Sequence, residues 1–313
     1  MTNLPASRPS RAVIEPVAPV VDAGRFAAMG ALGEPVDVIA DIFGVGHDAV
    51  GAARRWRFAP VGGRPGLWNE IPMRFLVNDR WSAVFDPTEL GRHEFQIIAW
   101  SDHLETWRHG TERKHEAGVD IAVELIGGEA ILLDVLDRAR ETAPPIADDV
   151  DAVQALLADV RSGEPKLLGD RSWDVLSFRY GRRAPIARSN VFAVDVDRER
   201  ARFSAWYEFF PRSTVGDEEG HATLRQAIDR LDRIAAMGFD VVYLPPIHPI
   251  GVVNRKGRNN STTAEPDDTG SPWGIADHLA VHSELGTLDD VRAFIAACHD
   301  RDMELAMDIA FQC

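Results

Sequence analysis

The sequence predicts a multidomain protein in which a β-sandwich with an inserted α-helical hairpin precedes a run of β/α units. Three changes of pattern support this prediction. Short strand-like runs separated by Gly and Pro turns fill the first hundred residues, as is typical of a sandwich. Apolar residues then recur every three or four positions, as on one face of a helix. After Phe203, strand and helix patterns alternate, which favours a parallel sheet.

The first domain is expected over residues 1–112. Residues 1–20 contain prolines at positions 5, 9, 16 and 19 and predict an irregular lead-in. From Val36 to Trp107 the pattern is β. The strand-like runs are 36–43, 55–58, 73–77, 81–85 and 93–100.

Residues 113–189 are expected to form a helical insertion and a basic connector. Apolar residues step along the first helix at Val119, Val123, Ile126, Ala130, Leu133 and Leu136. A second helix follows Pro144-Pro145 and ends near Gly163. Each helix can bury only one stripe, so the hairpin must pack on a second copy of the chain or on its own sandwich. Residues 190–202 then alternate as a strand that returns to the sandwich.

From residue 203 to residue 313 the pattern is β/α. Strands are predicted over 203–210, 240–244 and 304–309, with helices beginning at Thr223 and Thr287. Gly238 stands where a glycine commonly ends a helix. Sites in such folds lie at the carboxyl ends of the strands. The same rim should therefore carry Glu208, the loop 245–286, Asp308 and Gln312.

Composition excludes several classes of partner. The 313 residues carry a formal net charge of −15, which argues against nucleic acid and anionic membranes. Two cysteines, Cys298 and Cys313, are too few for a disulfide framework and favour a reducing compartment. Residues 1–11 lack the apolar segment of a signal peptide, and no apolar run reaches the roughly 18 residues that span a bilayer. We therefore expect a cytoplasmic protein.

The loop 245–286 is the main candidate for a site. Long loops without secondary structure are uncommon in compact domains and are often functional. This loop contains the run Arg255-Lys256-Gly257-Arg258-Asn259-Asn260 and, further on, Gly270-Ser271-Pro272-Trp273. No group of residues has the spacing of metal ligands, and no cofactor motif is present.

These two runs, with Asp308–Cys313, resemble the α-1,4-glucan:maltose-1-phosphate maltosyltransferases of the α-amylase superfamily, glycoside hydrolase family 13. The resemblance covers nearly the whole chain. It implies that residues 203–313 are the first β/α units of a (β/α)8 TIM barrel. It also implies a retaining glycosyltransferase that moves maltosyl units from α-maltose 1-phosphate to the non-reducing end of an α-1,4-glucan and releases phosphate.

The resemblance also assigns roles to residues. Lys256 and Gln312 match substrate-contacting positions of the family, and Asn260 and Ser271 match loop positions that border the sugar or phosphate. Asp308 is expected to support the site by hydrogen bonds. The family's catalytic nucleophile and acid/base lie on later strands, so no catalytic residue is expected in this chain, which would be an N-terminal portion that is inactive alone.

Two other functions remain open from the sequence. One is another glucanotransferase or hydrolase of the α-amylase superfamily, for which Lys256 beside a leaving phosphate has no evident use. The other is a non-catalytic dimerisation fragment. A homodimer through the sandwich and the helical insertion is expected both for a maltosyltransferase and for a dimerisation fragment.

Overall fold

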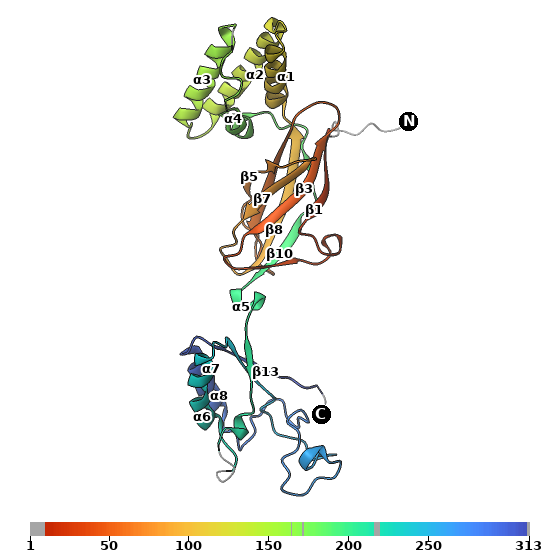
Figure 1. Cartoon of the computed structure of the whole chain (residues 1–313), viewed down its shortest axis with the longest axis vertical. Helices are drawn as coiled ribbons and strands as arrows, with labels where there is room; N and C mark the ends of the chain where they lie inside the picture. Colours follow the sequence, from red (N-terminus) through yellow and green to blue (C-terminus); the bar gives the residue numbers. More distant parts are fainter. Residues whose placement is uncertain (1–9, 164, 171, 216–219, 312–313) are drawn as a thin grey trace, which may run out of the picture. The chain divides into compact units, whose positions relative to one another are not determined.

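The computed structural model describes residues 10–311 apart from 164, 171 and 216–219. The chain divides into two compact units, Met1–Glu199 (unit 1) and Arg200–Cys313 (unit 2) (Figure 1).

Unit 1 contains two β-sheets. The first is antiparallel and has the order β1 (Ala12–Ala18), β3 (Val36–Gly44), β7 (Arg80–Phe85), β6 (Arg74–Phe75). The second has the order β2 (Ala28–Ala31), β10 (Phe192–Asp197), β8 (Gly91–Ser101), β4 (Val50–Phe58), β5 (Asn69–Pro72), with β9 (Ala187–Arg188) beside β8. Its pairs are antiparallel except β2 with β10. A short 3-10 turn, η1 (Asp22–Gly24), lies between β1 and β2.

The two sheets share one hydrophobic core. Alternate residues of β8 and β3 point into it, and Phe95, Ile97 and Val38 are fully buried there. Val194 of β10 joins the same core. Residues from both ends of unit 1's sequence therefore bury each other, and the return strand expected near residue 190 pairs with β8.

The expected irregular lead-in is wrong for residues 12–18, which form β1. Ala12 is buried and Ile14 packs against the shared core, so pairing with β3 buries the apolar face of this segment. Pro16 cannot donate to the ladder. The register shifts between Ile14 and Val17, and this irregularity accommodates the proline.

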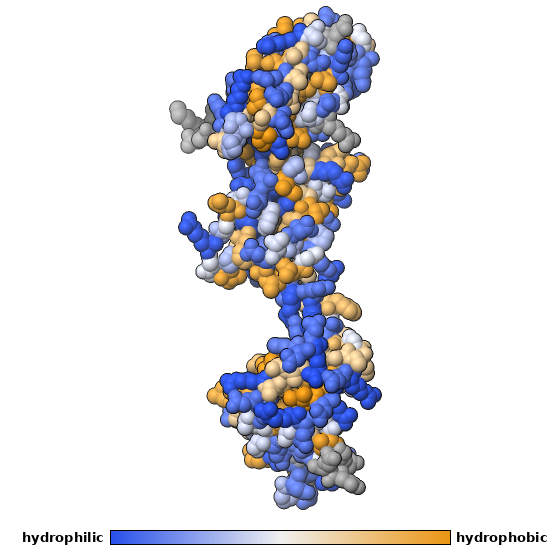
Figure 2. All heavy atoms as spheres, turned by 90° about the vertical axis from the view of Figure 1, so that its left-hand side faces the viewer, coloured by the Kyte–Doolittle hydropathy of each residue, from blue (hydrophilic) through white to orange (hydrophobic). Residues whose placement is uncertain are grey.

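In the described part of unit 1, four helices follow β8, where the sequence predicts a hairpin of two. They are α1 (His103–Glu116), α2 (Ala122–Glu141), α3 (Ala147–Arg161) and α4 (Ser172–Tyr180). They share a second core that includes Leu132, Leu156 and Trp173 (Figure 1). Helix α4 lies in the segment expected to be a connector. Apolar side chains also reach the surface over the helices of this unit (Figure 2).

The prediction that β structure continues to Trp107 is wrong, because Asp102 ends β8 and begins α1. Its carboxylate accepts a hydrogen bond from the backbone N–H of Glu105 at 2.9 Å, as an N-cap does. The hydroxyl of Ser177 lies 2.7 and 2.6 Å from the two carboxylate oxygens, which joins α4 to the start of α1. The expected boundary at residue 112 therefore falls inside α1.

Unit 2 contains a parallel sheet with the order β11 (Trp206–Glu208), β12 (Val241–Leu244), β13 (Glu304–Met307). Between the first two strands lie η2 (Pro211–Ser213), α6 (Leu224–Ala227), η3 (Ile228–Arg230) and α7 (Leu231–Ala236). Between the last two lie η4 (Arg258–Asn260) and α8 (Leu288–His299), and α5 (Glu199–Arg202) precedes the sheet.

Local signals predict the helix ends of unit 2 well. Thr223 with Gln226, and Thr287 with Asp290, each form a capping box. Gly238 has φ +83°, the left-handed conformation that a glycine adopts after a helix. Leu231 and Phe294 of the helices pack with Val242 of β12 in a core of their own. No helix in the described part of the chain is long and apolar enough to cross a bilayer.

Candidate functional site

The long loop after β12 is held by hydrogen bonds along its whole length. The N–H of Gly251 donates to the carbonyl of Gly274 at 2.7 Å, and that of His282 donates to the carbonyl of Ile247 at 2.8 Å. Ile250 and Ile275 form an isolated antiparallel bridge. The loop therefore folds back on itself, and its two halves lie side by side.

Arg255 holds the middle of the loop together. Its guanidinium donates to the backbone carbonyls of Ile250, Gly251 and Asp268, at 3.4, 3.2 and 3.0 Å. Arginine suits this task because its planar group presents several donors in fixed directions. In the basic run, Arg255 therefore stabilises the fold of the loop. Its neighbour Lys256 is exposed.

A cavity of about 390 Å³ lies between the basic run and the Gly270-Ser271 segment. It brings together three residues that the sequence singles out, Lys256, Asn260 and Ser271. The remaining lining residues are Gly257, Arg258, Asn259, Asp267, Asp268, Thr269 and Gly270. The lining is almost entirely polar, so it suits a ligand with many hydroxyl groups or a charged group.

Of the two basic side chains in this cavity, Arg258 has carboxylate partners and Lys256 has none among the described residues. Arg258 lies 3.5 Å from a carboxylate oxygen of Asp268 and 3.8 Å from one of Asp267. Asp268 is nearly buried, and it also accepts the N–H of Glu265 at 2.7 Å. No carboxylate of the described residues lies within ion-pair distance of Lys256. An incoming anion would therefore find one cation that no neighbour already neutralises.

The backbone at the cavity is tightly folded. A Cβ atom at Gly257 would lie 2.2 Å from the carbonyl oxygen of Thr263, so only glycine fits there. Asn259 and Asn260 have φ of 54° and 63°, a left-handed conformation that asparagine tolerates better than most residues. Asn260 therefore has a local reason to be asparagine that is independent of any ligand.

Asp308 lies directly after β13 and does not line this cavity. The indole N–H of Trp273 donates to its Oδ2 at 2.5 Å, and the Tyr243 hydroxyl also bonds this carboxylate. The hydrogen bond from Trp273 lowers the pKa of Asp308, and the bond from Tyr243 acts in the same direction. The pKa of Tyr243 is raised, first by burial and then by Asp308. Trp273 stands two residues after Ser271, so Asp308 is linked to the cavity through the loop.

Sequence reasoning did not single out Tyr243 or Arg255 as site residues. Tyr243 could have been noticed from strand order, because β12 and β13 pair in parallel and place it beside the end of β13. Arg255 has no such signal, since its bonds are all to backbone carbonyls, two of them four and five residues earlier and one thirteen residues later in the loop. Gln312, the other expected substrate contact, lies outside the described residues.

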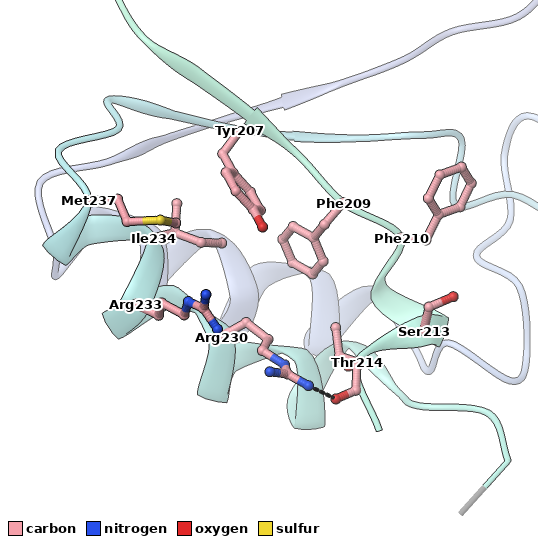
Figure 3. A pocket seen from close by; sticks show the side chains of 9 residues that line it. All are labelled: Tyr207, Phe209, Phe210, Ser213, Thr214, Arg230, Arg233, Ile234 and Met237. Atoms are coloured by element: carbon pink, nitrogen blue, oxygen red, sulfur yellow. Dashed lines mark hydrogen bonds between the residues drawn. The ribbon is translucent and has the colours of Figure 1, made fainter. Parts of the chain in front are cut away.

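A second cavity of about 400 Å³ lies between β11 and helix α7 (Figure 3). Tyr207 of β11 and Phe209 just after it point toward the helix, and Ile234 of α7 and its C-cap residue Met237 contribute to the apolar part of the lining. Arg230 donates to the carbonyl of Thr214 at 2.6 Å. The lining is mixed, since Ser213, Thr214 and Arg233 join the apolar side chains, and no residue expected to bind substrate is part of it. Among the described residues, no group of three or more His, Cys, Asp or Glu side chains could hold a metal ion.

Comparison with known proteins agrees with this division of the chain. The family model "Alpha-1,4-glucan:maltose-1-phosphate maltosyltransferase, domain N/S" matches residues 10–198. The model of the alpha amylase catalytic domain matches residues 208–312. The boundary between the two matches falls close to the boundary between units 1 and 2.

Three proteins named alpha-1,4-glucan:maltose-1-phosphate maltosyltransferase illustrate the similarity. The one from Myxococcus xanthus is 45% identical over 96% of this chain and 46% of its own length. The one from Burkholderia pseudomallei is 42% identical over 97% of this chain and 27% of its own length. The one from Rhodospirillum rubrum is 40% identical over 99% of this chain and 47% of its own length.

The chain thus spans about half the length, or less, of these relatives. The match to the domain N/S model covers more than half of the chain itself. This chain belongs to the α-1,4-glucan:maltose-1-phosphate maltosyltransferase family, with an N-terminal domain N/S followed by part of an α-amylase catalytic domain.

Proposed function

We propose that this chain is the N-terminal portion of a transferase that moves maltosyl units from α-maltose 1-phosphate to the non-reducing end of α-1,4-glucans. Phosphate is released and the anomeric configuration is retained. The observation that carries the proposal is family membership over residues 10–198 and 208–312. In this proposal unit 1 is a sandwich with a helical insertion, and unit 2 holds the first β/α units of a (β/α)8 barrel.

The cavity after β12 supports a phosphorylated sugar as the donor. A phosphate group needs charge-assisted hydrogen bonds, and Lys256 offers an exposed ammonium that has no carboxylate partner within the described part of the chain. The Ser271 hydroxyl and the Asn260 amide face the same cavity and suit sugar hydroxyls. Gln312 is proposed as a further substrate contact. Asp308 is proposed to support the site through Trp273 and Tyr243.

The chemical step needs residues that lie beyond residue 313 in this proposal. Retaining enzymes place a nucleophilic carboxylate and an acid/base carboxyl about 5–5.5 Å apart and form a covalent glycosyl intermediate. Phosphate is a good leaving group, so the acid matters less in forming that intermediate than in activating the acceptor hydroxyl. The role of unit 2 is then to bind and orient the donor.

The test is release of phosphate from α-maltose 1-phosphate with glycogen as the acceptor. A full-length transferase that includes this chain should release phosphate and lengthen the glucan by two glucosyl units per turnover. The 313-residue chain should bind α-maltose 1-phosphate without turning it over. Turnover by the 313-residue chain would contradict the placement of the carboxylates.

We also propose that the chain forms a homodimer through unit 1 and acts in the cytoplasm. Unit 1, whose described residues form two sheets and a cluster of helices, is the proposed site of the interface, and the proposed donor cavity lies in unit 2. Light scattering of the chain in solution measures the mass directly. A monomer at micromolar concentration would contradict the dimer and leave the transferase reaction untouched.

A further inference from the structure

A cavity of about 460 Å³ lies between the sheets and the helices of unit 1. Strands β4, β5, β6, β7 and β8 form its sheet side, and the start of α1 and helix α4 form its helix side (Figure 1). Pockets that bind small molecules commonly have volumes of about 300–1,000 Å³. None of the residues in this lining has a role in the function proposed above.

Trp100 of β8 gives the first indication of a ligand. It is 1% exposed, and its indole N–H has no hydrogen-bond acceptor among the described residues. A buried indole N–H usually has an acceptor. Trp173, which is also 1% exposed, shows the usual case, because its N–H donates to the carbonyl of Leu167 at 2.7 Å. The wall of the cavity therefore contains a donor that the described fold does not use.

Gly51 of β4 keeps the N–H edge of this indole open. It is the cross-strand partner of Trp100 and also lines the cavity. A Cβ atom at residue 51 would lie 2.5 Å from Cε2 and 2.6 Å from Nε1 of Trp100. Glycine inside a strand often marks a place where a ligand or another segment approaches closely. A side chain at residue 51 would cover the N–H edge, and glycine leaves that edge facing the cavity.

Carboxylates supply hydrogen-bond acceptors beside this donor. Asp102 is 9% exposed and has no ion-pair partner in the described part of the chain, although buried carboxylates usually have one. It accepts the N–H of Glu105 and the hydroxyl of Ser177, and these bonds use only part of the capacity of its two oxygens. Asp174 of α4 lines the same cavity and is exposed.

Two aromatic rings on the sheet side add an apolar surface. Phe75 and Trp81 are cross-strand partners, and their ring centroids lie 5.4 Å apart at an interplanar angle of 73°. Phe75 is 52% exposed. The indole N–H of Trp81 already donates to the carbonyl of Ile42 at 3.0 Å, so Trp81 offers the cavity its ring and not its donor. The pair can therefore pack against an apolar face of a ligand.

The combination of groups selects the chemical class of the ligand. A simple cation would suit Asp102 and Asp174 but would leave the Trp100 N–H without an acceptor. A small anion would accept from Trp100, but the lining holds three carboxylates against one cation, Arg74. A sugar fits every group, because its hydroxyls both donate to carboxylates and accept from an indole, and its C–H face packs on aromatic rings.

We propose that this cavity binds a neutral oligosaccharide, a chain of α-1,4-linked glucose, at a site separate from the cavity after β12. The choice of α-1,4-linked glucose rests on the proposed function, in which such a chain is the acceptor. Binding a long acceptor on unit 1 raises the effective concentration of its chain ends for the enzyme. The site holds the polymer and takes no part in the chemical step.

The first test follows the eight indole N–H signals of the isotope-labelled 313-residue chain by NMR as maltoheptaose is added. The signal that is missing in Trp100→Phe identifies Trp100, and it should shift as its N–H gains an acceptor. A Trp100 signal that does not move would overturn the site. Movement with tetramethylammonium and not with maltoheptaose would mean a cation site and would exclude the sugar.

The control ligand for this titration is cellohexaose, whose glucose units are β-linked. At the same concentration it should shift the Trp100 signal less than maltoheptaose does. Equal shifts with the two oligosaccharides would contradict the choice of an α-1,4-linked chain.

The second test measures the affinity for maltoheptaose by isothermal titration calorimetry. Phe75→Ala removes an exposed ring and should weaken binding about tenfold, and Trp100→Phe removes only the donor and should weaken it about threefold to tenfold. Because Phe75 is exposed, its variant should fold as the wild type does, so the test stands even if Trp100→Phe does not fold.

Two matched controls accompany these variants. Phe26→Ala removes a ring of unit 1 that is 55% exposed and lies outside the lining, and Lys256→Ala changes the cavity after β12. Both should leave the affinity for maltoheptaose unchanged. A loss in Lys256→Ala with none in Phe75→Ala would place the binding in unit 2 and refute the proposal.

The third test uses a full-length transferase that includes this chain and measures phosphate release with glycogen and with maltotetraose as acceptors. Phe75→Ala should raise the KM for glycogen several-fold and leave kcat and the KM for the short acceptor unchanged. Equal changes for both acceptors would contradict a site that holds the polymer.

The two proposals fail in different ways. An enzyme that releases no phosphate from α-maltose 1-phosphate, while maltoheptaose still shifts the Trp100 signal, would overturn the proposed function and support the site. Phosphate release without any shift of that signal would overturn the site alone.

Discussion

The indole N–H of Trp273 donates a hydrogen bond to Oδ2 of Asp308 over 2.5 Å and so joins the loop after β12 to the end of β13. The two residues are 35 positions apart in the sequence and come from opposite sides of α8.

Trp273→Phe should change stability in a way that depends on pH. The hydrogen bond lowers the pKa of Asp308 in the folded protein. The bond therefore adds its full contribution to the free energy of unfolding above the pKa of an aspartate in the unfolded chain. That contribution is lost as the pH falls through the pKa of Asp308 in the folded protein. The difference in unfolding free energy between wild type and variant should therefore be largest near neutral pH and shrink in acid. Urea unfolding at several pH values measures it.

Trp206→Phe is the matched control for that experiment. The Trp206 indole donates to the hydroxyl of Ser204 at 2.7 Å, and that hydroxyl has no charge to titrate in acid. The variant should lose stability by the same amount at every pH. A pH-dependent difference of equal size in both variants would contradict the assignment to Asp308.

Gly257→Ala should destabilise unit 2, because its methyl group would meet the carbonyl oxygen of Thr263 at 2.2 Å. Backbone atoms cannot yield as the end of a side chain can, and the expected loss is about 1–3 kcal/mol. Gly251→Ala is the control, since its methyl group would lie 3.4 Å from the carbonyl oxygen of Gly274. Thermal unfolding compares the two, and equal melting temperatures would contradict the crowding.

Gly128→Ala and Gly127→Ala should move the stability of unit 1 in opposite directions. The first places a methyl group 2.0 Å from the Trp107 ring and should cost about 1–3 kcal/mol. The second meets nothing in the chain and should gain up to about 1 kcal/mol from helix propensity. Far-UV circular dichroism during urea unfolding, at a concentration where the chain is monomeric, measures both.

Lys256→Ala should weaken use of α-maltose 1-phosphate far more than use of maltooligosaccharides in a full-length transferase. A charge-assisted hydrogen bond contributes about 1.5–3 kcal/mol, which corresponds to roughly 10- to 150-fold in kcat/KM. Lys166→Ala changes an exposed lysine of unit 1 and should leave both activities unchanged. Equal losses for the phosphorylated and the neutral donor would favour the hydrolase alternative.

The sequence predicts the elements that depend on local signals. Thr223 and Thr287 begin helices because each has a partner three residues on, and Gly238 ends one because of its left-handed backbone. The sequence does not predict where β8 ends, because the capping of α1 by Asp102 is reinforced by Ser177, a residue 75 positions away. It also misjudges α2, where Val123, Ile126 and Leu133 of the predicted stripe are exposed, and the side that faces the core includes Leu125, Leu132, Val135 and Leu136.

The candidate site was predictable where it depends on short runs of sequence. Lys256, Asn260 and Ser271 belong to two short runs that line one cavity, and their contact with substrate stays a prediction. The supporting contacts of Asp308 were not, because Tyr243 and Trp273 reach it only through the folding of β12, β13 and the loop.

The position of β10 has a consequence for how the protein is made. Strand β8 ends at Ser101, but β10, its neighbour in the sheet, begins only at Phe192. During synthesis the four helices emerge from the ribosome before that sheet can be completed, and their core uses only residues 104–180. The helical cluster can therefore condense first and hold the two ends of the unfinished sheet close together until the last strand arrives.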